Sequence, residues 1–124
     1  MPSVLVIEDQ KPVRESIGEI LELVHCDPQL VGDGQVAFEI LIKTKFDLIT
    51  LDLNMPSLDG LSLAESLDVQ DNPNHETPII VISAYLSDNA LSSLQQLGIE
   101  HWLPKPFEAE ELLQLVRSTL NIKE

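Results

Sequence analysis

Five side chains that could act together on a phosphoryl group stand at the ends of separate apolar runs. Glu8 and Asp9 follow the first run, Asp52 and Ser83 end later ones, and Lys105 follows the last. Carboxylates packed together repel one another unless a cation lies among them, and their oxygens suit Mg²⁺ or Mn²⁺. A lysine and a hydroxyl suit phosphoryl oxygens, so the set predicts a site that accepts a phosphoryl group on an aspartate. Each residue alone is more often a helix cap or a loop residue, so the prediction depends on the fold that positions them.

Short apolar runs alternate with amphipathic stretches along the chain, which predicts alternating strands and helices. The predicted strands cover residues 3–7, 29–31, 47–51, 78–82 and 101–103. Helices are expected from Pro12, over 36–41, from Asp59-Gly60, after a cap at Ser87 or Asp88, and after Glu108, with a polar loop over 71–76. Strict alternation implies an α/β fold with a parallel sheet covered on both faces. Ligands bind such sheets outside the carboxyl ends of the strands, where the five candidate residues stand.

Length and charge narrow the class of protein. With 124 residues we expect one domain, residues 1–124, and no output domain within the chain. Asp and Glu number 21 against 7 Lys and Arg, a net charge of −14 that disfavours binding to nucleic acid or to anionic lipid. Cys26 is the only cysteine, and neither a signal peptide nor a membrane-length apolar run is present, which predicts a cytoplasmic protein without disulfides.

Five motifs in order resemble those of the receiver domain of two-component response regulators, of the chemotaxis-regulator kind, over essentially the whole chain. They are Val4-Leu5-Val6-Ile7-Glu8-Asp9, Asp47-Leu48-Ile49-Thr50-Leu51-Asp52, Met55-Pro56 with Asp59-Gly60, Ile82-Ser83-Ala84, and Leu103-Pro104-Lys105-Pro106-Phe107. The resemblance implies a flavodoxin-like three-layer sandwich around a doubly wound five-stranded parallel sheet of order 2-1-3-4-5. The first and third strands are neighbours in that order, which would set Asp9 beside Asp52.

The resemblance also implies a role for each site residue. Asp52 would be the phosphoacceptor, taking a phosphoryl group from a histidine of a partner kinase or phosphotransfer protein, and Lys105 would contact that group. Asp9 and Asp52 would ligate Mg²⁺, with Mn²⁺ as the alternative ion, together with the backbone carbonyl of Asn54. Glu8 would reach the metal through water.

Four further expectations concern the switch and its output. Ser83 resembles the hydroxyl that moves toward the aspartyl phosphate, and Trp102 stands at the position of the aromatic partner, where tyrosine or phenylalanine is more usual. Asn54 and Tyr85 are expected to tune the lifetime of the phosphate, because a bulky ring at Tyr85 would obstruct the line along which water attacks. The signal would pass to a downstream protein partner.

Three other functions compete with this interpretation. A receiver-like interaction domain that phosphorylation does not control is the main alternative, and the intact set of site residues argues against it. A haloacid-dehalogenase-like phosphatase needs its nucleophile after the first strand and an aspartate two residues later, whereas Asp52 follows the third strand and Asn54 fills the later position. A flavin-binding module needs backbone donors for phosphate where this chain carries Glu8 and Asp9.

Overall fold

The computed structural model describes residues 1–55, 58–68 and 71–121, and it contains the alternating strands and helices that the sequence predicts. The strands are β1 Ser3–Ile7, β2 Asp27–Val31, β3 Leu48–Leu51, β4 Ile79–Ser83 and β5 His101–Pro104. The helices are α1 Lys11–Leu23, α2 Gly34–Leu41, α3 Gly60–Leu67, α4 Asp88–Gln96 and α5 Ala109–Leu120. Pro56 of the Met55-Pro56 motif lies outside the described residues.

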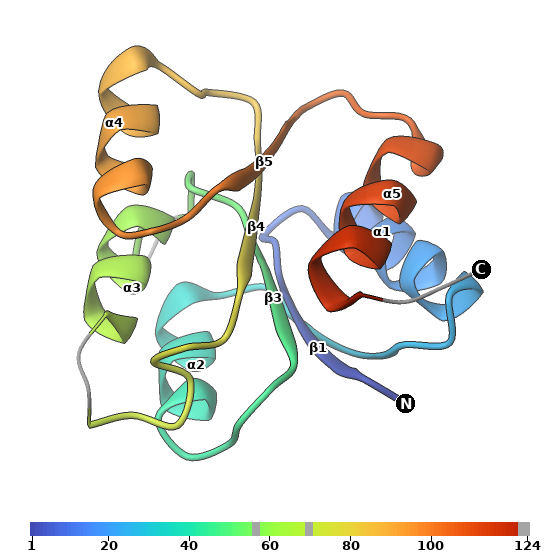
Figure 1. Cartoon of the computed structure of the whole chain (residues 1–124), viewed down its shortest axis with the longest axis horizontal. Coiled ribbons are helices and arrows are strands. Elements are labelled where there is room, and N and C mark those ends of the chain that lie inside the picture. The colour runs from blue at the N-terminus through green and yellow to red at the C-terminus, as the bar shows by residue number, and fades with distance from the viewer. Residues whose placement is uncertain (56–57, 69–70, 122–124) are drawn as a thin grey trace.

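All five strands pair in parallel in the order β2-β1-β3-β4-β5. Helices α1 and α5 cover one face of the sheet, and α2, α3 and α4 cover the other (Figure 1). The doubly wound sheet of order 2-1-3-4-5 is therefore confirmed. Its order reverses between β1 and β3, so the carboxyl ends of these neighbouring strands frame the crevice where such sheets bind ligands.

The apolar runs are continuous because both faces of the inner strands are buried. Successive side chains of β1 point to opposite faces: Val4 and Val6 pack with α1 and α5, whereas Leu5 and Ile7 pack with the helices on the other side. Two apolar clusters result, one on each face of the sheet, and together they hold the strands rigidly beneath the loops that carry the polar residues.

Strand β2 begins at Asp27, two residues earlier than the sequence predicts. The backbone N–H of Asp27 donates to the carbonyl of Pro2 at 2.8 Å, and Asp27 pairs with Ser3 of β1. Pro28 is tolerated within this strand because β2 is an edge strand, where a missing N–H need not break a ladder.

Of the two caps expected for α4, Ser87 is the one used, since its side chain accepts a hydrogen bond from the N–H of Ala90.

The polar segment before β4 is a loop, as predicted, but one of its side chains is buried, which the sequence did not reveal. Asn74 is only 1% exposed. Its Nδ2 donates to the carbonyls of Leu41 and Thr44, both at 2.7 Å. Its Oδ1 accepts from the N–H of Phe46 and the hydroxyl of Thr77, both at 2.9 Å. Asn74 thus ties the end of α2 and the start of β3 to the residues that lead into β4.

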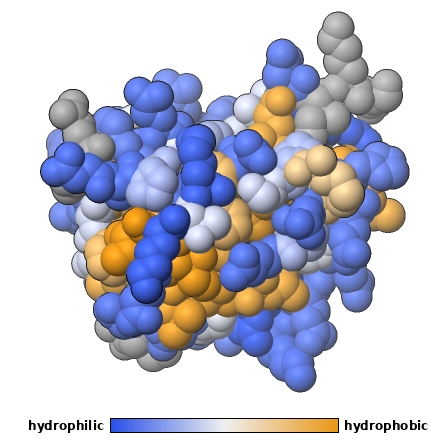
Figure 2. Space-filling model, turned by 90° about the horizontal axis from the view of Figure 1, so that it is seen from below, coloured by the Kyte–Doolittle hydropathy of each residue, from blue (hydrophilic) through white to orange (hydrophobic). Residues whose placement is uncertain are grey.

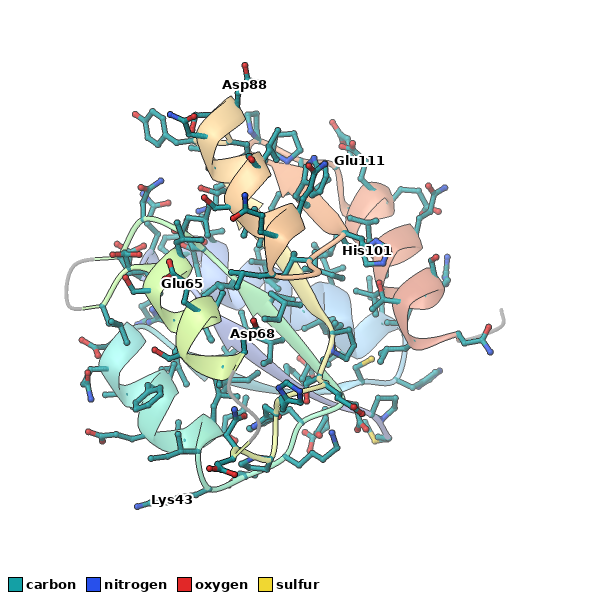
Figure 3. The ribbon with its side chains drawn as sticks, turned by 60° about the vertical axis from the view of Figure 1, so that its left-hand side comes forward. Lys43, Glu65, Asp68, Asp88, His101 and Glu111 are labelled. Carbon is teal, nitrogen blue, oxygen red and sulfur yellow. The ribbon has the colours of Figure 1, made fainter. Side chains whose placement is uncertain are left out.

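The surface is mostly acidic and polar. Exposed acidic side chains include Glu65 on α3, Asp88 on α4 and Glu111 on α5 (Figure 3). Seen from the end where the strands begin, apolar surface gathers in one region and hydrophilic residues surround it (Figure 2). Within the described ranges, no helix is long and apolar enough to cross a membrane.

Candidate functional site

Three carboxylates meet at the carboxyl ends of β1 and β3. Glu8 and Asp9 directly follow β1, and Asp52 directly follows β3, whose register pairs Ile7 with Leu51. The N–H of Asp52 extends this pairing by donating to the carbonyl of Ile7 at 3.0 Å. One carboxylate oxygen of each acid lies within 4.8 Å of those of the other two. The predicted cluster is therefore present, and its oxygen donors and concentrated negative charge fit a divalent cation such as Mg²⁺.

Burial makes this cluster costly in the absence of a positive charge. Glu8 is 1% exposed and Asp52 is 4% exposed, whereas Asp9 is open to solvent. Burial raises the pKa of Glu8 and the negative charge of Asp52 adds to this rise, although the hydrogen bond from Lys105 opposes it. The site consequently combines two sheltered carboxylates with one accessible carboxylate, which leaves a path for a cation from solvent.

Lys105 brings the compensating charge into the cluster. Its Nζ lies 2.6 Å from Oε1 of Glu8 and 3.4 Å from Oδ2 of Asp52. The lysine is held there because its backbone N–H donates to the carbonyl of Ser83 at 3.0 Å, which continues the pairing of β4 and β5. Burial disfavours the charged ammonium, but the hydrogen bond to Glu8 and the charges of Glu8 and Asp52 outweigh this effect, so the pKa of Lys105 is raised. The lysine therefore stays charged beside Asp52.

Asn54 connects Asp52 with Ser83, a link that the sequence did not reveal. Its N–H donates to Oδ1 of Asp52 at 3.2 Å, and its side-chain Nδ2 donates to the hydroxyl of Ser83 at 3.4 Å. Ser83 ends β4 and is fully buried. The proposed acceptor and the proposed switch hydroxyl thus share one asparagine.

The two aromatic residues expected near the site differ in their surroundings. Trp102 on β5 is half-buried and packs against the apolar cluster beneath α2, α3 and α4. Tyr85 has a side chain that is 75% exposed, while its N–H donates to the hydroxyl of Ser83 at 3.3 Å. Neither arrangement tests the roles expected of these rings, which stay predictions.

Two further residues shape the site in ways that the sequence did not reveal. Nη1 of Arg14, near the start of α1, donates to the carbonyls of Glu8 and Asp9 at 2.8 and 3.3 Å. At Gly60, the first residue of α3, an added Cβ would lie 2.3 Å from the carbonyl oxygen of Asp52. The sequence shows that Gly60 directly follows Asp59, which caps α3. It does not show that this glycine lies against the backbone of Asp52.

An apolar pocket of about 620 Å³ opens beside the carboxylate cluster. It lies between α1 and the segment that joins β5 to α5, and Lys105 forms part of its wall. Its apolar lining includes Val13, Ile20, Pro106 and Phe107. Lys105 connects this pocket with the carboxylate cluster, because its Nζ also lies 3.4 Å from Oδ2 of Asp52.

Comparison with known proteins gives one consistent family. Residues 4–117 match the response regulator receiver domain. The chain is 33% identical over 117 residues to response regulator MprA of Mycolicibacterium vanbaalenii, an alignment that covers 94% of this chain and 49% of that protein. MprA of Mycobacterium leprae shows the same identity, with 50% of its length covered. The chain therefore spans about half the length of the curated relatives it matches.

Solved structures share the fold over nearly its full extent. The receiver domain of Francisella response regulator 1452 superposes with a TM-score of 0.86 at 34% identity, covering 98% of both chains. Vibrio cholerae chemotaxis protein CheY4 gives a TM-score of 0.87 at 28% identity, covering 97% of this chain and 99% of its own. The receiver domain of sensor histidine kinase PA1611 from Pseudomonas aeruginosa, solved with a magnesium ion in its active site cleft, gives 0.82 at 28% identity, covering 97% and 98%.

Proposed function

Because this chain belongs to the response regulator receiver domain family, we propose that it is a signalling switch that accepts a phosphoryl group on Asp52. Receiver domains are switches and not classical enzymes, so the chemistry serves to change the protein itself. The observation that carries the proposal is the sheltered Asp52 carboxylate beside Lys105 and within 4.8 Å of the carboxylates of Glu8 and Asp9.

The donor in this proposal is a phosphohistidine of a kinase or phosphotransfer protein. An oxygen of Asp52 attacks phosphorus, the P–O bond forms as the P–N bond to the imidazole breaks, and the imidazole leaves and regains a proton. Lys105 stabilises the negative charge on the transferring oxygens, since its ammonium already lies 3.4 Å from Asp52. Attack of water on phosphorus later releases inorganic phosphate and restores the carboxylate.

The carboxylate cluster supports a divalent cation as cofactor. Asp9 and Asp52 would hold Mg²⁺, or Mn²⁺, directly with the backbone carbonyl of Asn54, and Glu8 would act through water. When bound, the ion neutralises charge on the phosphoryl oxygens. The buried Glu8 keeps its ion pair with Lys105, which fixes the lysine where it can contact the phosphoryl group.

The switch proposed here runs from Ser83 to Trp102. The hydroxyl of Ser83 would leave its contact with Asn54 to donate to the aspartyl phosphate, and Trp102 on the adjacent strand would repack in response. Asn54 and Tyr85 would set how long the phosphate survives, because both lie next to Ser83 in the loops over the site.

The apolar pocket beside Lys105 supports a protein partner as donor. A helix that presents its histidine to Asp52 could seat a neighbouring apolar side chain among Val13, Ile20 and Phe107. The net charge of −14 favours a partner with a basic face, and it disfavours direct contact with nucleic acid or with an anionic membrane. Output would then pass through a downstream protein.

The proposal is tested by incubating the protein with a small-molecule phosphodonor and Mg²⁺ and measuring its intact mass. We expect the wild type to gain one phosphoryl group and the Asp52→Asn variant to gain none, because the amide is nearly isosteric but a poor nucleophile. Circular dichroism checks that the variant is folded. If the wild type gains no mass under these conditions, the chain is an interaction domain that phosphorylation does not control.

A further inference from the structure

Arg14 holds the backbone that carries two of the three site carboxylates. Its Nη1 donates to the carbonyl of Glu8 at 2.8 Å and to that of Asp9 at 3.3 Å. A guanidinium shared by two successive carbonyls fixes the orientation of the peptide between them, and with it the directions in which both side chains leave the backbone.

The space for this guanidinium is provided by a glycine just after the neighbouring strand. Gly32 directly follows β2, beside the point where the N–H of Glu8 donates to the carbonyl of Val31 at 3.0 Å. A Cβ at Gly32 would lie 2.4 Å from Nη1 of Arg14, and the three heavy atoms nearest to it all belong to the guanidinium. Alanine at this position would therefore displace the end of the arginine side chain and little else.

We propose that Arg14 is a positioning residue for the metal-binding carboxylates of Glu8 and Asp9, and that Gly32 keeps open the space its guanidinium occupies. This inference rests on the proposed Mg²⁺ site. Neither residue touches the metal: each acts through the peptide that connects the two acids. Groups that orient metal ligands in this way typically change metal affinity by about 10- to 100-fold when they are removed.

Electrostatics alone makes the opposite prediction, which allows a sharp test. Arg14 is a positive charge beside a site for a cation, so if it acted only through its charge, its removal would tighten Mg²⁺ binding. If it acts by positioning, its removal weakens binding even though a repelling charge is lost. Gly32→Ala separates the two effects further, because it leaves the charge in the protein and moves only its position.

The experiment measures the dissociation constant of Mg²⁺ by isothermal titration calorimetry for the wild type, Arg14→Met, Gly32→Ala and the double variant. We expect each single change to weaken binding about tenfold. The double variant should equal Arg14→Met, because without the guanidinium the added Cβ meets none of its three nearest atoms. Lys43→Met is the control for lost charge, since Lys43 is exposed and points away from the molecule (Figure 3). Metal-free melting curves verify that every variant is folded.

Three results would overturn the inference while the proposed function stands. They are unchanged affinity in both single variants, tighter binding by Arg14→Met, and a double variant weakened by the product of the two single effects. A wild type that binds no Mg²⁺ would instead contradict the metal site in the proposed function. Phosphorylation by the small-molecule donor at saturating Mg²⁺ provides the second readout, because a positioning defect that only weakens the metal is overcome by excess metal.

Discussion

Replacing Asp9 by asparagine should stabilise the metal-free protein. A carboxylate oxygen of Asp9 lies within 4.8 Å of those of Glu8 and Asp52, so the side chain takes part in two repulsive pairs. At that separation two unit charges repel by about 1 kcal/mol in water and about 3.5 kcal/mol at an effective dielectric constant of 20. Asp9 is exposed, so the lower figure applies to each pair, and Lys105 offsets a part of it. We expect the free energy of unfolding to rise by about 1–2 kcal/mol, which raises the melting temperature by roughly 3–6 °C.

The same variant should respond weakly to Mg²⁺. At one hundred times its dissociation constant, a cation that binds only the native state adds about 2.7 kcal/mol, or roughly 8 °C for a chain of this size. If loss of a direct ligand weakens binding about a hundredfold, Asp9→Asn gains only about 0.4 kcal/mol at the same concentration, close to 1 °C. Differential scanning calorimetry with and without Mg²⁺ measures both changes.

Glu65→Gln is the matched control, because Glu65 is exposed on α3 and away from the carboxylate cluster. Glu111 is less suitable, since its Oε1 accepts a hydrogen bond from the N–H of Glu108 at 2.8 Å and so caps α5. We expect Glu65→Gln to melt and to respond to Mg²⁺ like the wild type. If Asp9→Asn also gains the full increment from Mg²⁺, then Asp9 is not a ligand and the metal site has been misplaced.

Three further predictions concern the switch residues, the lifetime of the phosphate and the buried side chain of Asn74. A beryllofluoride mimic of the phosphoryl group with Mg²⁺ should change the fluorescence of Trp102, the only tryptophan, and Ser83→Ala should reduce that change; identical spectra would show that hydroxyl and ring are uncoupled. Tyr85→Ala should shorten the phosphoaspartate lifetime by removing the ring that obstructs water, measured as phosphate release, whereas equal lifetimes would exclude this role for the ring. Asn74→Ala should lower the free energy of unfolding by about 3–5 kcal/mol in urea denaturation, because it leaves several buried hydrogen-bonding groups without partners. A loss below about 1 kcal/mol would contradict this explanation.

The sequence predicted a parallel sheet with its polar residues at one edge for a physical reason, whereas the strand order that sets Asp9 beside Asp52 was implied by the resemblance to receiver domains. A strand buried on both faces is a continuous apolar run, and parallel strands bring their carboxyl ends to one edge. A polar residue at the end of such a run is therefore placed by the fold, whatever its distance along the chain. The same logic placed Ser83 and Lys105.

Arg14 and Asn74 could not be predicted in this way. Arg14 lies near the start of a helix, where a basic residue usually faces solvent, and its use depends on the space left by Gly32, directly after β2. Asn74 belongs to a segment whose composition is typical of an exposed loop. Its burial arises only when α2, β3 and β4 are assembled around it. Contacts made by side chains between elements leave no periodic pattern in the sequence.

The pairing of Lys105 with Glu8 and Asp52 has a consequence for the order of events during synthesis. Glu8 leaves the ribosome early and Asp52 near the middle of the chain, but Lys105 follows with the last strand. Until β5 has docked beside β4, the two buried carboxylates have no ammonium between them. A nascent chain that has formed only its first four strands can present Asp52 but not the cation beside it. If Lys105 stabilises the transferring phosphoryl group as proposed, efficient phosphorylation of Asp52 would begin only after β5 has docked beside β4.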